Sequence, residues 1–118
     1  MNEKIKSVTW VGDSREQVRR FPKAARRTVG EALRFAQWGG KHPKSKPLRS
    51  VGSGVLEIVV PYDTNTYRAV YTVKIGEKIY VLHAFQKKST RGIRTPKQEI
   101  DLIKRRLKIA RNMETRNE

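Results

Sequence analysis

Three apolar segments in the middle of the chain, joined by short polar turns, most constrain what this sequence can fold into. They are rich in β-branched and aromatic side chains and span residues 55–60, 67–73 and 79–85. Pro61 ends the first segment, and Gly76 opens the turn that leads into the third. Segments of this length and composition, separated by turn residues, are typical of neighbouring strands joined by hairpins. We therefore predict a small antiparallel sheet at the centre of the domain.

Helical patterns precede these strands. Residues 8–11 predict a short first strand, and Asp13 or Ser14 can cap a helix that runs to about residue 21. Pro22 suits the first turn of a second helix. The apolar stripe of that second helix recurs at helical spacing and consists of Val29, Ala32, Leu33 and Ala36. Two consecutive helices are therefore expected before the main strands, with residues 41–54 as a loop.

A further helix follows the strands. Thr95 can cap it, Pro96 suits its first position and Glu99 lies in its first turn. Its apolar stripe consists of Ile100, Ile103, Leu107 and Ala110. The order β-α-α-β-β-β-α predicts an α+β domain whose helices pack on one face of a small antiparallel sheet. We expect one domain, residues 1–118, with a core of about 8–110.

The charge of the chain indicates its partners. It carries 27 Lys and Arg against 11 Asp and Glu, a net charge of +16. An excess of this kind attracts polyanions. Nucleic acid is the leading candidate, because Lys and Arg bind its phosphates favourably and release the counterions held there. An acidic protein comes second, and we expect no membrane partner because the basic stretches lack a strong apolar face. The polar N-terminus and the lack of cysteine predict a cytoplasmic protein.

Several common kinds of catalytic site are not expected. The chain has two histidines, His42 and His83, and no cysteine, which argues against a zinc site. No glycine-rich phosphate loop precedes a helix, and the few carboxylates are scattered, which argues against a two-metal nuclease. We therefore expect no metal and no cofactor.

The remaining route to phosphodiester chemistry is cationic. Lys87 and Lys88 end the last strand of the predicted sheet, and Arg68 lies on the neighbouring strand. Arginine stays protonated and can stabilise a phosphate, whereas a lysine whose pKa neighbouring cations lower can also transfer a proton. Further cations that could hold a nucleic-acid backbone precede or follow these residues: Lys46, Arg49, Arg91, Arg94 and Lys97.

Each of these residues also has a plain structural interpretation. Lys87 and Lys88 could simply be solvated at a strand end, and Arg68 could form an ion pair with Glu57 on the preceding strand. His83 alternates with Ile79 and Val81 and is more typical of a half-buried histidine with satisfied hydrogen bonds than of a general base.

In order along the chain, several short motifs resemble one known group of proteins. They are Lys46-Pro47-Leu48, Val55-Leu56-Glu57-Ile58, Tyr67-Arg68-Ala69-Val70-Tyr71, Leu82-His83-Ala84-Phe85-Gln86-Lys87-Lys88, and Thr95-Pro96 with Glu99. This set, over about residues 8–110, resembles the phage-derived, HigB-like branch of the RelE/ParE toxin superfamily. The strand that ends in Phe-x-Lys-Lys and is followed by Thr-Pro and a helix is its most specific part.

The resemblance implies the toxin of a type II toxin–antitoxin module. Many such toxins are ribosome-dependent, metal-independent mRNA endoribonucleases, and a cognate antitoxin, often a helix-turn-helix protein, neutralises them and contacts operator DNA. By position, the resemblance assigns Arg68 to the scissile phosphate and Lys87 and Lys88 to the active site. The chain departs from some ribosome-dependent relatives at two places. They carry a C-terminal catalytic tyrosine, whereas no tyrosine follows Tyr80 here, and they carry lysines on the strand where this chain has Glu57 and Val59. The proton would therefore pass through His83 or a lysine.

Two other functions stay open. Some members of the superfamily bind and inhibit DNA gyrase without acting as enzymes, and the fold alone does not fix the target. A decayed module that only binds nucleic acid or an antitoxin is the third possibility.

Overall fold

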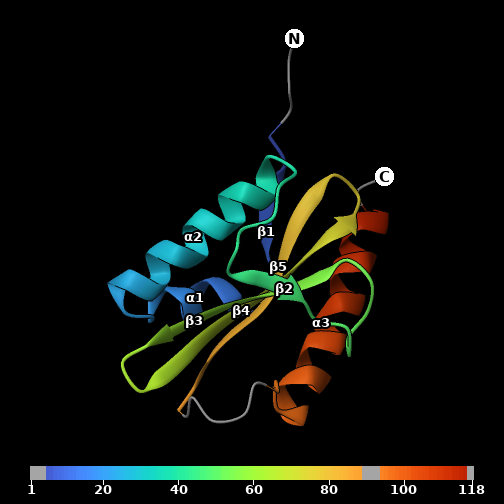
Figure 1. The fold of residues 1–118 in the computed structure, drawn as a ribbon. Helices are drawn as coiled ribbons and strands as arrows, with labels where there is room; N and C mark the ends of the chain where they lie inside the picture. The colour runs from blue at the N-terminus through green and yellow to red at the C-terminus, as the bar shows by residue number, and fades with distance from the viewer. Residues whose placement is uncertain (1–4, 89–93, 117–118) are drawn as a thin grey trace.

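The three central segments form the middle of a five-stranded sheet (Figure 1). The computed structural model describes residues 5–88 and 94–116. The central strands are β3 (Val55–Tyr62), β4 (Asn65–Ile75) and β5 (Lys78–Lys87), each antiparallel to the next. They confirm the hairpins predicted from the turn residues and the small α+β domain.

Two further strands complete the sheet, in the order β1-β5-β4-β3-β2. β1 (Ser7–Trp10) lies parallel to β5, so an entirely antiparallel sheet was a wrong prediction. No tight turn joins β1 to its neighbour, and a connection through helices allows a parallel pair. β2 (Ser45–Pro47) pairs with β3 inside the segment expected to be a loop. An edge strand of three residues that includes a lysine and a proline is too short to show the alternation of apolar and polar side chains, so the sequence did not predict it.

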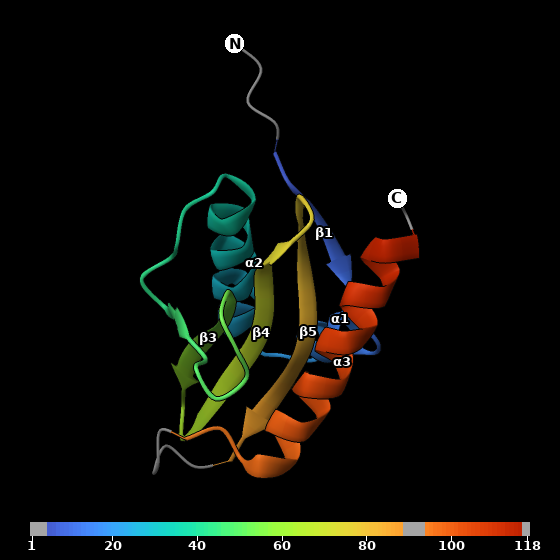
Figure 2. The same cartoon turned by 90° about the vertical axis from the view of Figure 1, so that its right-hand side faces the viewer.

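The helices cover both faces of the sheet, not one face as predicted (Figures 1 and 2). α1 (Ser14–Arg19) and α2 (Lys23–Gln37) pack on one face, and α3 (Lys97–Arg116) packs on the other. The reason lies in β4, where all side chains from Thr66 to Thr72 are buried. Because neighbouring side chains of a strand point to opposite faces, such a strand needs cover on both.

A β-bulge in β5 determines which face carries His83. Val70 pairs with His83 but Tyr71 pairs with Val81, so Leu82 is an extra residue in β5. Val81 therefore packs under α2, while Leu82 packs under α3. The bulge also breaks the predicted alternation and places His83 on the α3 face, the face to which Arg68 points.

The far end of α3 is held by a buried tyrosine. The Tyr80 hydroxyl donates to Glu114 Oε1 at 2.7 Å, and Lys78 Nζ lies 3.8 Å from the same oxygen. Burial and the Glu114 carboxylate raise the pKa of Tyr80 to about 12. The folded protein therefore favours the neutral tyrosine well above the pH at which an unfolded chain ionises.

This shift predicts a pH-dependent stability difference between the wild type and Tyr80→Phe. Since the folded pKa is raised, the stabilisation is complete below about pH 10, the usual tyrosine pKa, and is lost as pH rises towards 12. At neutral pH the free energy of unfolding of the wild type should be about 1 kcal/mol higher than that of Tyr80→Phe, because one hydrogen bond usually contributes about this much. Urea unfolding at pH 8, 10 and 12 should show this difference shrink. A difference that stays constant with pH would contradict it, and Tyr62→Phe, at an exposed position, is the control.

Candidate functional site

A cavity of about 660 Å³ lies between the β2–β3 segment and the segment that leads into α3. Among the described residues, three cations line it, together with a carboxylate and two hydroxyls. This lining is Lys46, Pro47, Leu48, Ser50, Glu57, Arg94, Thr95, Pro96, Lys97 and Ile100. We call it the basic groove. Figure 2 shows the segment before α3 passing close below the loop that follows β2. The groove therefore joins parts of the chain that are far apart in sequence.

The short strand β2 brings Lys46 to the groove. Lys46 pairs directly with Glu57 across β2 and β3, so the two residues are cross-strand neighbours. Lys46 is exposed, while Glu57 is only 1% exposed. The edge strand, which was missed from the sequence, thus fixes a cation beside a buried carboxylate.

Arg68 lies beneath the groove and forms a buried ion pair with Glu57. Arg68 Nη1 donates to Glu57 Oε1 at 3.1 Å, with the two side chains 3% and 1% exposed. Thr95 Oγ1 donates to the other carboxylate oxygen at 2.6 Å and lies 3.5 Å from Arg68 Nη1. The structural interpretation of Arg68, an ion pair with the preceding strand, is confirmed. A phosphate contact by Arg68 stays a prediction.

His83 has a partner at each ring nitrogen. Nε2 lies 2.8 Å from Glu99 Oε2, and Nδ1 lies 3.3 Å from Arg106 Nη1. Because a guanidinium only donates, Nδ1 must accept, and the proton of the neutral ring is therefore on Nε2, facing Glu99. The ring also stacks on Phe85 at 5.2 Å. His83 is thus the histidine with satisfied hydrogen bonds that the sequence favoured, although at 6% exposure it is buried more deeply than the half-buried position expected. A role in proton transfer stays a prediction.

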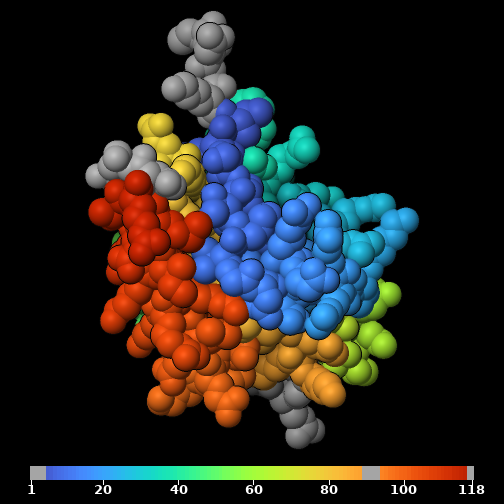
Figure 3. All heavy atoms as spheres, turned by 180° about the vertical axis from the view of Figure 1, so that it is seen from behind, coloured from blue at the N-terminus to red at the C-terminus, as the bar shows by residue number. Residues whose placement is uncertain are grey.

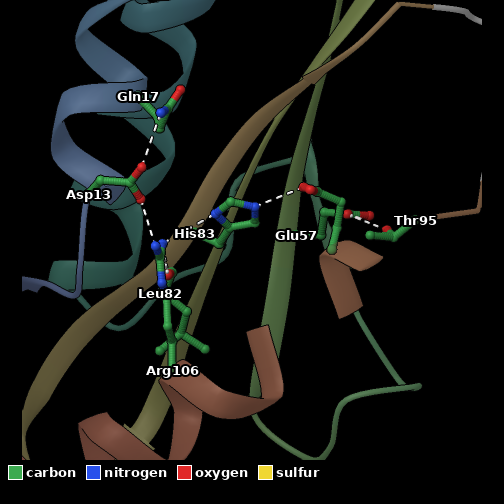
Figure 4. Close-up of polar contacts among 8 residues, drawn as sticks. Asp13, Gln17, Glu57, Leu82, His83, Thr95 and Arg106 are labelled. Carbon is green, nitrogen blue, oxygen red and sulfur yellow. Dashed lines mark hydrogen bonds and ion pairs between the residues drawn. The ribbon is translucent and has the colours of Figure 1, made fainter. Parts of the chain in front are cut away.

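Arg106 extends this contact to the start of α1. Its Nη2 donates to Asp13 Oδ1 at 2.7 Å, and its Nη1 donates to the Leu82 carbonyl at 3.1 Å. Figure 4 shows Gln17, Asp13, Arg106 and His83 joined in one series of contacts. The hydrogen bonds from Arg106 and Gln17 hold the pKa of Asp13 below its usual value. Asp13 thus serves as a partner of α3, and neither it nor Ser14 caps α1 through its side chain.

A glycine makes room for Arg106. Gly12 has φ +58°, and a Cβ there would lie 2.8 Å from Arg106 Cζ. In Figure 3 the β1–α1 region lies between α2 and α3 at the surface, where this connection is made. The series of contacts fixes α3, and with it the segment that carries Thr95, against the rest of the fold.

The other cations predicted for the site differ in their positions. Arg94 and Lys97 line the basic groove, and Lys87 Nζ donates to the Arg94 carbonyl at 3.0 Å, which places the end of β5 next to it. Lys88 is exposed at that end. Arg49 lines a separate hollow of about 330 Å³. Arg91 lies outside the described residues.

Sequence reasoning missed the part that Glu57 and Thr95 play in the groove. Glu57 was noted as a partner of Arg68 and as a departure from the family pattern, and Thr95 as a helix cap and part of a family motif. The available signal was a carboxylate within the apolar β3 segment and an arginine within the apolar β4 segment that follows it, since buried charges are seldom left unpaired.

Residues 5–88 and 94–116 lack two further features, a metal site and a membrane-spanning helix. No three His, Asp or Glu side chains there lie close enough together to hold a metal ion. In the same ranges no helix combines the length and apolar character needed to cross a bilayer.

Comparison with known proteins gives the chain a family. The family described as "Phage derived protein Gp49-like (DUF891)" matches residues 16–108, which is most of the chain. No curated protein and no solved structure matches it. The fold is consistent with a RelE-like fold. Membership of a toxin–antitoxin family implies an antitoxin as a partner. The chain belongs to the Gp49-like family of phage-derived proteins, within the RelE/HigB-type toxin group.

Proposed function

We propose that the chain is the toxin of a type II toxin–antitoxin module and cuts mRNA on the ribosome without a metal ion. The observation that carries this proposal is the basic groove, where exposed cations surround the wall formed by Glu57 and Thr95. Its volume of about 660 Å³ is in the usual range for ligand sites. A single-stranded segment of mRNA is the proposed occupant.

The exposed cations would bind the scissile phosphate. Lys46, Arg94 and Lys97 line the groove, and Lys88 lies at the nearby end of β5. Cations fixed around a phosphate stabilise the additional negative charge of the pentacoordinate transition state. Arg68 would act from below as a positioning residue, since its guanidinium contacts both Glu57 and Thr95.

RNA cleavage also requires two proton transfers. The 2′-hydroxyl loses a proton as its oxygen attacks phosphorus, and the departing 5′-oxygen gains one as its bond breaks. Among the described residues of the groove lining, Glu57 is the one carboxylate and could accept the first proton, while Lys46 or Lys97 could donate the second. His83 has Glu99 and Arg106 as partners, and we propose that it acts on the site through α3.

The proposal also names partners. The antitoxin would be a helix-turn-helix protein, and the toxin would reach operator DNA only through it. The ribosome as target would place the activity in the cytoplasm.

Induced expression followed by mapping of mRNA 5′ ends tests the activity. We expect growth arrest and new 5′ ends confined to translated frames, which disappear when initiation of translation is blocked. The purified chain with ribosomes should cleave equally well in EDTA, once ribosomes are stabilised by polyamines. A DNA-damage response and loss of gyrase supercoiling, without new 5′ ends, would select gyrase as the target. Normal growth would select a binding module.

A further inference from the structure

We propose that the outer face of α2 is the docking surface for the antitoxin, and that the antitoxin contributes an acidic segment with an apolar anchor. We define the α2 face by Lys23, Arg26, Arg27, Arg34, Phe35 and Trp38, all of which are exposed. The inference rests on the toxin–antitoxin part of the proposed function but not on the nuclease mechanism. It goes beyond that function because it assigns the partner to a surface away from the basic groove.

The apolar part of this face lies in the last turn of α2. Phe35 is 47% exposed and Trp38 is 55% exposed. They form a hollow of about 370 Å³ together with Arg34 and Gly40. The Phe35 ring meets His42 edge-on at 5.0 Å, which holds it in place. Adjacent large aromatic side chains left in water next to an arginine are typical of the centre of a protein interface.

The rest of the face is positively charged. Lys23, Arg27 and Arg34 follow one another on the outer side of the helix, opposite the buried stripe that contains Val29 and Leu33. Glu31 is the one carboxylate of α2, and it lies 3.9 Å from His42. A partner must therefore be acidic where it passes these cations. A second copy of this chain, with its net charge of +16, would place like charges against each other.

The arrangement of charge and apolar surface favours a protein over RNA. From Trp38 to Arg27 the helix rises about 16 Å, at about 1.5 Å per residue. A helical segment of similar length could place an apolar side chain in the hollow and carboxylates opposite Arg34 and Arg27. RNA would satisfy the cations but would leave the Phe35–Trp38 hollow without an aliphatic occupant.

The position of the face separates the two partners. α2 covers the face of the sheet opposite to α3 (Figure 1), whereas the basic groove lies beside the start of α3. An antitoxin on α2 would leave the groove uncovered. The antitoxin would then neutralise the toxin because its size and its negative charge prevent the complex from binding the ribosome.

Isothermal titration with purified proteins tests the assignment. The antitoxin is the product of a flanking gene that restores growth when it is co-expressed with this chain. The variants are Phe35→Ala/Trp38→Ala for the hollow and Arg27→Glu/Arg34→Glu for the cations. The matched control, Arg105→Glu/Lys108→Glu, makes the same charge change at exposed positions of α3. A fluorescent ribosomal RNA hairpin is titrated in parallel.

We expect each α2 variant to weaken antitoxin binding by about 30-fold or more, the usual effect of interface hot spots. The control should stay within about three-fold, as rim charges do. Antitoxin binding unaffected in the α2 variants would overturn the proposal, as would the lack of any neutralising flanking product. A loss confined to the RNA hairpin would assign the face to RNA and also overturn it. Because the titration does not involve mRNA cleavage, failure of the nuclease mechanism would leave its result unchanged.

Discussion

Replacing either Arg68 or Glu57 alone by alanine should lower the free energy of unfolding by about 3–5 kcal/mol, because each variant leaves a buried charge without its partner. The two side chains are 3% and 1% exposed and meet at 3.1 Å. Urea denaturation midpoints measure the loss. The double variant Glu57→Leu/Arg68→Met should recover most of it, since apolar side chains of similar volume can replace a buried pair.

The exposed ion pair in α3 provides a matched control. Lys97 Nζ lies 3.0 Å from Asp101 Oδ2, and both side chains are more than half exposed. Asp101→Ala should therefore cost no more than about 0.5 kcal/mol. If Arg68→Ala cost as little as this control, the buried pair would not have the energetic importance that its burial implies.

The apolar double variant also separates stability from activity. A loss of toxicity in Arg68→Ala alone could reflect unfolding, so it cannot test a role at the site. In the folded double variant, loss of the proposed proton acceptor should reduce mRNA cleavage by about 100-fold or more. Cleavage at the wild-type rate in that variant would exclude Glu57 and Arg68 from the mechanism.

The hairpins of the fold were predictable from the sequence, whereas the two-sided cover of the sheet was less so. Turn residues and β-branched runs are local signals, and they identified β3, β4 and β5 closely. The bulge at Leu82 has no such signal, because every residue from Ile79 to Phe85 is buried and the strand shows no alternation of buried and exposed positions. Yet this extra residue decides that His83 faces α3.

The site was predictable only in part, for the same reason. From the sequence, the partner of Arg68 could be either a phosphate or Glu57. Which of the two it contacts depends on the strand register and on the burial of both side chains. The contact between Thr95 and Glu57 joins residues 38 positions apart through a side-chain hydroxyl. The connection between Arg106 and Asp13 spans 93 positions. Such contacts follow from how the elements pack and leave no periodicity in the chain.

Removing positive charge from the basic groove should reduce mRNA cleavage without destabilising the protein. In Lys46→Gln/Arg94→Gln, two exposed side chains that line the groove lose their charge. Loss of even one group that stabilises a transition state commonly lowers the rate by about 100-fold or more. The free energy of unfolding, measured from urea denaturation, should change by at most about 0.5 kcal/mol, as for other surface substitutions. In vitro cleavage on programmed ribosomes gives the rate.

The control for this prediction is Lys44→Gln/Lys104→Gln, which removes the same charge from exposed positions of neighbouring segments outside the groove lining. Its cleavage rate should fall by no more than about three-fold, since neither side chain lines the groove and solvent ions screen exposed charges that do not contact the phosphate. Equal losses in the two double variants would mean that total charge, and not the groove, determines activity. Because both variants carry the same net charge, any difference between them reports where the phosphate lies.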